Sequence, residues 1–167
     1  MTVESNAALS ALKQALELEQ KGYEFYQQAA KRTADPKGAT MFRSLADDEA
    51  THRRVIQRQI DALTKGQGWL RLTEVGDVKA DLHTLLFPAG KLELEKAIRP
   101  DASDLDALLF ALKIENDSFD LYATQAKANQ DPNARRTFEF LTDAERSHFN
   151  LLMLNYESLS SLGGWVD

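Results

Sequence analysis

Two motifs of identical spacing combine an acid with a histidine. DDEATHRRVI (residues 47–56) and DAERSHFNLL (residues 143–152) each contain Asp-x-Glu-x-x-His inside an apolar helical pattern. A carboxylate and an imidazole three residues apart project from the same face of a helix. If that face points into a core, two polar groups are buried together, which is costly unless they are paired or bind a metal. The motifs therefore predict a buried polar site whose charges are compensated by a partner.

Two further glutamates occupy positions at which the apolar stripe of a helix would normally carry leucine. We expect four glutamates and two histidines to converge in one core: Glu19, Glu49, His52, Glu115, Glu145 and His148. Four carboxylates packed together repel one another unless cations lie among them. Two divalent ions would neutralise the four charges, and a shell of carboxylate oxygens and imidazole nitrogens suits iron or manganese. The ligand set does not choose between these two metals.

The two motifs belong to an internal repeat. A shift of 96 residues aligns residues 12–69 with 108–165 without a gap, and 17 of the 58 aligned positions are identical. Besides the six residues of the predicted site, the identical pairs include Tyr26/Tyr122, Asp47/Asp143 and Trp69/Trp165. We interpret the repeat as a duplication, so the two halves should share one local fold.

Each half of the repeat is predicted to form a hairpin of two long helices. Asp35-Pro36 and Asp131-Pro132 are typical of a helix N-cap followed by proline at the first helical position. We expect helices over about 5–33, 36–65, 103–129 and 132–162. The scarcity of Gly (8) and Pro (4) also favours helix over other structures. The predicted fold class is all-α.

A long connection, over about residues 66–102, joins the two hairpins. Its length would let the chain travel the full height of a bundle, with a short helix near 77–87. Two helical hairpins joined by one long crossover form the ferritin-like version of the four-helix bundle. We therefore predict one ferritin-like domain over residues 1–167.

The heights of the four glutamates agree with this arrangement. In an antiparallel hairpin, residues equally far from the turn lie side by side. The midpoint of Glu19 and Glu49 is residue 34, and that of Glu115 and Glu145 is residue 130, so both midpoints fall in predicted turns. The glutamates should lie about 15 residues, or roughly 22 Å, from their turns, near the middle of the bundle.

The sequence resembles the rubrerythrin-type branch of the ferritin-like superfamily over nearly the whole chain outside the crossover. The resemblance rests on EQKGYEFY (19–26) and ENDSFDLY (115–122), together with EATH (49–52) and ERSH (145–148). One glutamate from each of two helices, with Glu-x-x-His from the other two, is the arrangement known for di-iron and di-manganese carboxylate bundles. The resemblance thus implies two iron ions, with manganese as the alternative.

The resemblance also implies a role for each residue. Glu49 and Glu145 would bridge or flank the two metals, the other two glutamates would be terminal ligands, and each histidine would cap one metal. Tyr26 and Tyr122 would hydrogen-bond ligand carboxylates. A core tyrosine whose hydroxyl is merely satisfied is an equally good interpretation of each.

The sequence departs from the rubrerythrin pattern at two points. Rubrerythrins carry a rubredoxin domain whose iron is bound by four cysteines, and this sequence has no cysteine. Electrons would therefore come from a separate protein such as rubredoxin. Rubrerythrins also tend to have an additional glutamate three residues after the third-helix ligand, which is associated with iron shifting between ligands during peroxide reduction. Here that residue is Ser118.

Composition excludes several other classes of function. The net charge of −6 and the absence of basic runs interleaved with aromatics argue against binding to nucleic acid. No apolar run approaches the roughly 18–20 residues of a membrane span, and the N-terminus lacks a signal pattern. Without cysteine there are no disulfides, no Cys-bound zinc and no Cys-bound iron–sulfur centre. We expect a cytoplasmic protein.

Three functions are compatible with these features. The first, which we favour, is a non-haem di-iron oxidoreductase that reduces peroxide or O₂ with electrons from an external donor. The second is a ferroxidase coupled to iron storage, as in ferritins. The third is a metal-binding bundle without catalysis. The resemblance further implies a homodimer, and the long crossover leaves domain swapping open.

Two other repeated pairs receive structural interpretations. Asp47 and Asp143 lie two residues before the motif glutamates, so they should point away from the core, toward solvent or an interhelical ion pair. Trp69 and Trp165 follow the histidines by 17 residues and should close the ends of the bundle.

Overall fold

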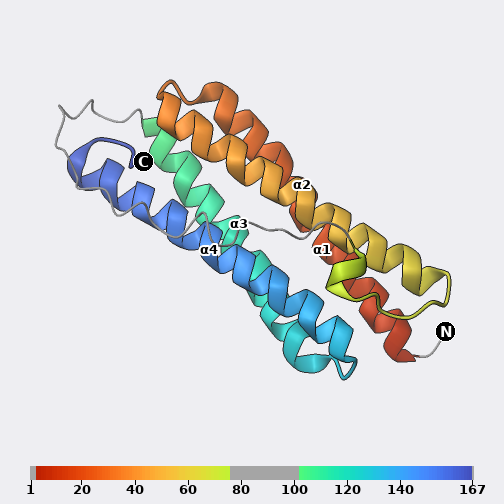
Figure 1. Cartoon of the computed structure of the whole chain (residues 1–167). Helices are drawn as coiled ribbons and strands as arrows, with labels where there is room; N and C mark the ends of the chain where they lie inside the picture. Colours follow the sequence, from red (N-terminus) through yellow and green to blue (C-terminus); the bar gives the residue numbers. More distant parts are fainter. Residues whose placement is uncertain (1–2, 76–101, 167) are drawn as a thin grey trace.

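The computed structural model describes residues 3–75 and 102–166 as four long helices and one 3-10 turn. These are α1 (Val3–Arg32), α2 (Pro36–Thr64), η1 (Leu72–Glu74), α3 (Ala102–Ala128) and α4 (Pro132–Leu162). No strand occurs in the two segments described. α1 packs against α2, α3 packs against α4, and α1 also lies beside α3 (Figure 1). The predicted all-α four-helix architecture is confirmed.

The helix boundaries follow from the predicted capping residues. The side chain of Asp35 accepts a hydrogen bond from the amide of Lys37 at 2.7 Å, and Asp131 accepts from Asn133 at 2.7 Å. Each aspartate thereby satisfies an amide that has no partner inside the first turn. α4 ends where Gly163 takes a left-handed conformation, with φ of 74°, which glycine adopts without steric cost. All four predicted helices are confirmed to within two residues at each end.

The two hairpins point in opposite directions. α2 ends and α3 begins at opposite ends of the bundle (Figure 1). η1 occupies the first part of the connection between them. The predicted short helix near 77–87 lies outside the described residues.

The apolar core is divided into two clusters. The first joins the beginning of α1 to the end of α2, around Leu12 and Ile56, and includes Phe138 of α4. The second joins the end of α1 to the beginning of α2, around Phe42, and includes Leu108 of α3. The predicted polar residues occupy the middle of the same helices, between the two clusters. Apolar packing on both sides keeps water away from this region and lowers its dielectric constant.

The two tryptophans pack at the ends of the bundle, as predicted, and each covers a phenylalanine of the other half. Trp165 meets Phe42 at a centroid distance of 5.6 Å, and Trp69 meets Phe138 at 5.8 Å. The backbone of the residue after each tryptophan is hydrogen-bonded to a buried side-chain amide of the preceding helix. Gln59 exchanges two hydrogen bonds of 2.9 Å with the backbone of Leu70. The side chain of its repeat partner, Asn155, accepts from the amide of Val166 at 3.2 Å.

Gly38 makes the close approach of Trp165 possible. A Cβ atom at residue 38 would lie only 2.5 Å from Cε2 of the indole ring and 2.7 Å from Cγ2 of Thr33. Any larger residue would therefore displace the ring that closes this end of the bundle.

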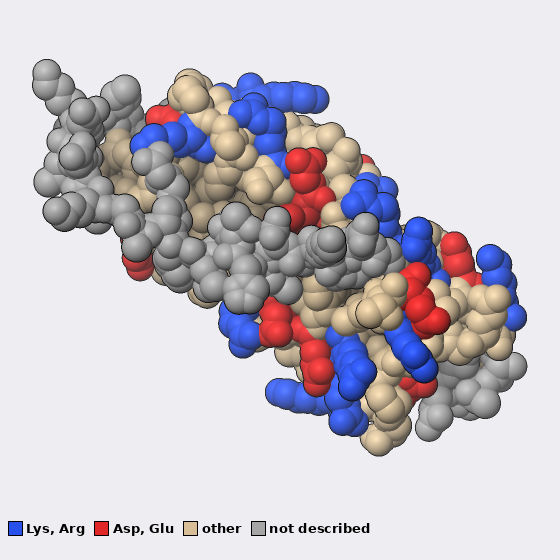
Figure 2. Space-filling view, viewed as in Figure 1, with Lys and Arg blue, Asp and Glu red and all other residues tan. Residues whose placement is uncertain are grey.

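Figure 2 shows acidic and basic side chains mixed together on the parts of this face that are coloured. Asp47 and Asp143 are exposed, as predicted, and Asp143 pairs with Arg146 of its own helix. None of the described helices is both long enough and apolar enough to span a membrane.

Candidate metal centre

The structure brings all six predicted residues together in the middle of the bundle. Each is buried, with an exposed fraction between 0% and 4%: Glu19, Glu49, His52, Glu115, Glu145 and His148. α1 and α3 each supply one glutamate, and α2 and α4 each supply one Glu-x-x-His pair. Buried acids at this density stand in contrast to the mixed charges of the surface.

The six side chains form two overlapping groups of potential metal ligands. One group contains Glu19, Glu49, His52 and Glu145, and the other contains Glu49, Glu115, Glu145 and His148. Within each group, one donor atom from every residue lies within 4.8 Å of all the others. Glu49 and Glu145 belong to both groups. The arrangement is therefore compatible with two adjacent metal ions that share two carboxylates.

We call Glu49 and Glu145 the shared glutamates, and Glu19 and Glu115, which each belong to one group, the private glutamates. Each histidine contacts one private glutamate and both shared ones. Nδ1 of His52 lies 3.2 Å from Oε2 of Glu19 and 3.2 Å from Oε1 of Glu145. Nδ1 of His148 lies 3.4 Å from Oε2 of Glu115 and 3.5 Å from Oε1 of Glu49. The two rings are stacked, with centroids 5.5 Å apart. Both histidines thus direct Nδ1 toward the carboxylates.

Burial and mutual repulsion separate the pKa values of the four glutamates. Burial and the charges of Glu49 and Glu145 raise the pKa of Glu19 well above its ordinary value. Burial and Glu145 do the same to the pKa of Glu115. Burial also acts to raise the pKa of the two shared acids, but hydrogen bonds from neighbouring glutamates and both histidines outweigh it and lower that pKa. In the metal-free cluster the pKa values of Glu19 and Glu115 are therefore raised and those of Glu49 and Glu145 are lowered.

The imidazoles respond to the same concentration of acids. Burial alone would lower the pKa of His52, but the charge of Glu19 and the hydrogen bonds to the surrounding glutamates together outweigh burial and raise that pKa well above its ordinary value. Glu115 and a hydrogen bond with Asp48 raise the pKa of His148 in the same way. The cluster favours positive charge at its centre, which a bound cation would supply.

Two tyrosines hold the private glutamates from the opposite half of the bundle. The hydroxyl of Tyr26 donates to Oε1 of Glu115, and the hydroxyl of Tyr122 donates to Oε1 of Glu19. Both rings are completely buried. The resemblance implied hydrogen bonds from these tyrosines to ligand carboxylates, with a core tyrosine whose hydroxyl is merely satisfied as the equal alternative, and the structure contains hydrogen bonds to carboxylates of the cluster.

Several polar atoms of the cluster are left without a hydrogen bond. Oε2 of Glu115, Oε1 of Glu145 and Nδ1 of His148 are buried and have no partner of acceptable geometry. Unpaired buried polar atoms are rare because each costs the free energy of desolvation. Carboxylate oxygens and imidazole nitrogens in this condition fit a divalent metal of the iron or manganese type.

The chain matches the family model described as Rubrerythrin over residues 10–156. It belongs to the rubrerythrin family. A search among curated proteins found no match. The likeness that the sequence predicted is therefore confirmed at the level of the family.

Two solved structures share the fold of this rubrerythrin-family chain. A hypothetical protein from Pyrococcus furiosus superposes with a TM-score of 0.65 at 19% identity, over 95% of this chain and 93% of that one. A two-domain protein from Anabaena variabilis ATCC 29413, with DJ-1/ThiJ/PfpI-like and ferritin-like domains, superposes with a TM-score of 0.60 at 17% identity. That match covers 96% of this chain and 38% of the other. At these identities the likeness concerns the fold, which is ferritin-like.

One residue that contacts the cluster was missed by the sequence analysis. Oδ2 of Asp48, on α2, lies 3.3 Å from Nε2 of His148 on α4. Asp48 has no acidic counterpart, because residue 144 of the second half is alanine. The position of Asp48 directly before Glu49 could have indicated a contact with the cluster. The internal repeat does not point to it, because the residue at the equivalent position is not acidic.

A glycine of α1 makes room for a shared glutamate. A Cβ atom at Gly22 would lie 3.3 Å from Cδ of Glu49, which is closer than most real contacts of Cβ. The repeat counterpart of Gly22 is Ser118, the residue that occupies the position of the extra rubrerythrin glutamate. Ser118 is buried, with an exposed fraction of 3%. The two halves thus surround the shared acids differently.

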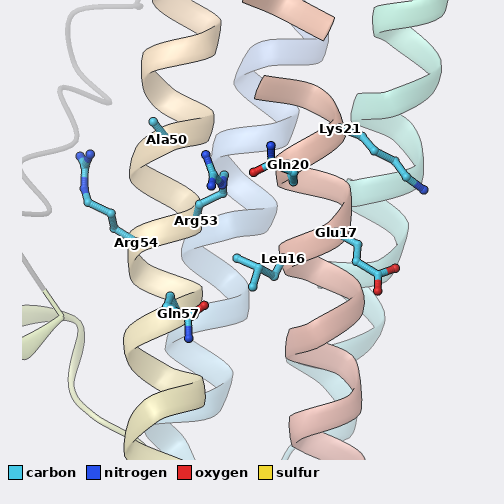
Figure 3. Close-up of a pocket in the computed structure, with 8 residues that line it drawn as sticks. All are labelled: Leu16, Glu17, Gln20, Lys21, Ala50, Arg53, Arg54 and Gln57. Carbon is cyan, nitrogen blue, oxygen red and sulfur yellow. The ribbon is translucent and has the colours of Figure 1, made fainter. Parts of the chain in front are cut away.

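A groove of about 710 Å³ lies outside the cluster, between α1 and α2. Gln20 and Arg53 extend into it (Figure 3), although each directly follows a residue of the cluster in the sequence. Successive residues of a helix point about 100° apart, so neighbours of Glu19 and His52 face outward. None of the six cluster residues lines this groove, so it is separate from the candidate metal centre.

Proposed function

We propose that this rubrerythrin-family chain is a non-haem di-iron carboxylate protein that reduces peroxide or O₂ with electrons from an external donor. The observation that carries the proposal is the sharing of Glu49 and Glu145 between two groups of four donors. Two shared and two private carboxylates, with one imidazole on each side, give an oxygen-rich and nitrogen-containing donor set for two ions.

The proposed ligands divide into three kinds. Glu49 and Glu145 would bridge or flank the pair of ions, Glu19 and Glu115 would each bind one, and the two histidines would each complete one side. Two iron ions would supply the redox chemistry by cycling between the ferrous and ferric states. Manganese fits the same donors and is the alternative metal.

The chain's own residues would prepare and protect this centre. The apolar clusters on both sides exclude water, which strengthens every electrostatic interaction between the cluster and a cation. Tyr26 and Tyr122 fix Oε1 of the private glutamates, so the second oxygen of each is the one available to a metal. Burial and the nearby carboxylates raise the pKa of both tyrosines, so their hydroxyl protons stay in these hydrogen bonds.

We propose that the electrons come from another molecule. A sequence without cysteine offers no thiolate-bound iron to deliver them. We therefore propose a separate electron-transfer protein such as rubredoxin as the donor. We further propose that the chain acts as a cytoplasmic homodimer.

The test is an anaerobic titration of the metal-free protein with Fe(II), followed by peroxide or air in separate cuvettes. We expect saturation at two irons per chain, and then ferric absorption in the near ultraviolet. The oxidant that reacts faster identifies the substrate. Absence of saturable Fe(II) binding would overturn the proposal. A closed cage of many chains in light scattering, with faster oxidation by air, would favour storage of iron instead.

A further inference from the structure

The surroundings of the two histidines differ, although the six residues of the cluster are related in pairs by the internal repeat. Three glutamates surround Nδ1 of His52, and their counterparts in the internal repeat surround Nδ1 of His148. On the other side of the ring the halves differ. Nε2 of His148 meets the carboxylate of Asp48 at 3.3 Å. No acid in the described segments stands in this relation to His52, because the equivalent residue is Ala144.

An aromatic ring occupies the neighbourhood of His52. Phe140 meets the imidazole of His52 edge to face, at a centroid distance of 6.0 Å and an interplanar angle of 88°. The counterpart of Phe140 in the first half is Ser44, which is exposed. His52 therefore packs against an apolar ring, whereas His148 contacts a charged hydrogen-bond acceptor.

The unpaired atoms of the cluster show the same inequality. Nδ1 of His52 already makes a hydrogen bond of 3.2 Å with Oε2 of Glu19. The corresponding atoms of the second group, Nδ1 of His148 and Oε2 of Glu115, are both buried without a hydrogen bond. A cation at the first group has to replace an existing interaction. A cation at the second group replaces no hydrogen bond, because these two atoms make an ion pair of 3.4 Å with each other but no hydrogen bond. The third unpaired atom of the cluster, Oε1 of Glu145, belongs to a shared acid and lies 3.2 Å from Nδ1 of His52.

From these observations we propose that Asp48 is a positioning residue that makes the two metal positions unequal, with the His148 position filling first and binding more tightly. The inference rests on the proposed function, because it requires that the cluster binds two ions. Oδ2 of Asp48 accepts a hydrogen bond from Nε2–H of His148 and fixes the ring so that Nδ1 faces the glutamates. A carboxylate in this place makes the imidazole a stronger ligand and adds negative charge near the ion.

The experiment is a calorimetric and absorbance titration of metal-free protein with Co(II), which binds oxygen and nitrogen donors without being oxidised by residual air. The wild-type protein should bind two ions in two resolved steps. His148→Ala should remove the tighter step and His52→Ala the weaker one. Two steps of equal affinity, or a tighter step that survives His148→Ala, would overturn the inference.

Variants of Asp48 test its role directly. Asp48→Ala should weaken the tighter step by about 10- to 100-fold. Asp48→Asn keeps an oxygen acceptor and should lose less. Asp47→Ala is the matched control. Asp47 is the residue next to Asp48 and its side chain is exposed, so this variant loses the same charge outside the cluster. An Asp48→Ala protein that binds Co(II) as tightly as the Asp47→Ala protein would contradict the inference.

Adding a carboxylate to the other half gives the reciprocal test. Ala144→Asp places an acid at the repeat counterpart of Asp48, so the weaker step should become tighter. Thermal unfolding of each metal-free variant separates this effect from a loss of stability. The proposed function fails separately: a wild-type protein that binds no Co(II) contradicts both proposals, whereas two equal ions contradict only the inequality.

Discussion

The hydroxyl of Tyr26 donates a hydrogen bond to Glu115, which is 89 residues away in the sequence and belongs to the other half of the repeat. Tyr122 and Glu19 form the reciprocal bond, over 103 residues. Each hairpin therefore anchors a glutamate of its partner hairpin. The polar centre is held by bonds between the halves, and the same bonds tie the halves together.

Removal of either tyrosine hydroxyl should destabilise the protein. Tyr26→Phe leaves Oε1 of Glu115 buried without its donor, and we expect a loss of about 1–3 kcal/mol in the free energy of unfolding. Tyr122→Phe should have a similar effect through Glu19. Tyr23→Phe is the control, because its hydroxyl accepts an exposed hydrogen bond from Gln27. Urea denaturation of the metal-free proteins measures all three. Equal stability of the Tyr26 and Tyr23 variants would show that the buried bond contributes nothing.

The shared glutamates should be indispensable for metal but not for folding. Glu49→Ala combined with Glu145→Ala removes the two acids common to both groups of donors, so tight binding of both ions should be lost. The fold should survive, because removal of two buried acids relieves repulsion in the metal-free core. Metal content after dialysis and the circular dichroism spectrum measure the two effects.

The matched control replaces Asp47 and Asp143, which are also repeat partners and also acidic but are exposed. Asp47→Ala with Asp143→Ala changes the net charge equally and should keep both ions. If the double glutamate variant still retained two tightly bound ions, the proposed ligands would be wrong.

Local rules and the internal repeat account for what could be predicted from the sequence. Asp35 and Asp131 determine where two helices begin, and the midpoint of Glu19 and Glu49 at residue 34 determines their common height. These features depend on one hairpin at a time. The contact between Asp48 and His148 depends on how the hairpins face each other, and no repeat partner marks it. The sequence predicted hydrogen bonds from the tyrosines, but not that each acceptor belongs to the opposite half.

Gly22 should be needed for the placement of Glu49. Gly22→Ala puts a Cβ atom 3.3 Å from Cδ of that glutamate, so the carboxyl group has to shift. Alanine is favoured over glycine inside a helix by about 1 kcal/mol, so the metal-free protein should not lose stability. We expect weaker binding of Co(II) with an unchanged or higher melting temperature. Ser118→Ala, at the repeat counterpart, already has a Cβ and should bind as the wild type does. Unchanged affinity for Co(II) in Gly22→Ala would show that the added Cβ atom does not displace the carboxyl group of Glu49.

The metal-free protein should lose stability as the pH rises from about 5 to about 8. Burial and neighbouring acids raise the folded-state pKa of Glu19 and Glu115 above the unfolded values, and the private glutamates raise that of both histidines. A group with a raised folded-state pKa contributes stability fully below its unfolded pKa, and the contribution disappears as the pH rises through the folded-state pKa. Unfolded glutamate and histidine have pKa values of about 4.3 and 6.5. The melting temperature should fall across this range.

Two further measurements separate this explanation from general effects of pH. Glu49 and Glu145 have a lowered pKa, so their contribution is lost only as the pH falls below about 4.5. Glu19→Gln with Glu115→Gln cannot lose the two protons, so the melting temperature of this variant should fall less steeply between about pH 5 and about pH 8. Saturating metal should reverse the slope of the wild-type protein, because ions replace the protons of the cluster and bind more tightly as the pH rises. A metal-free wild-type protein whose melting temperature rises over the same range would mean that the cluster is not the dominant titrating group in the fold.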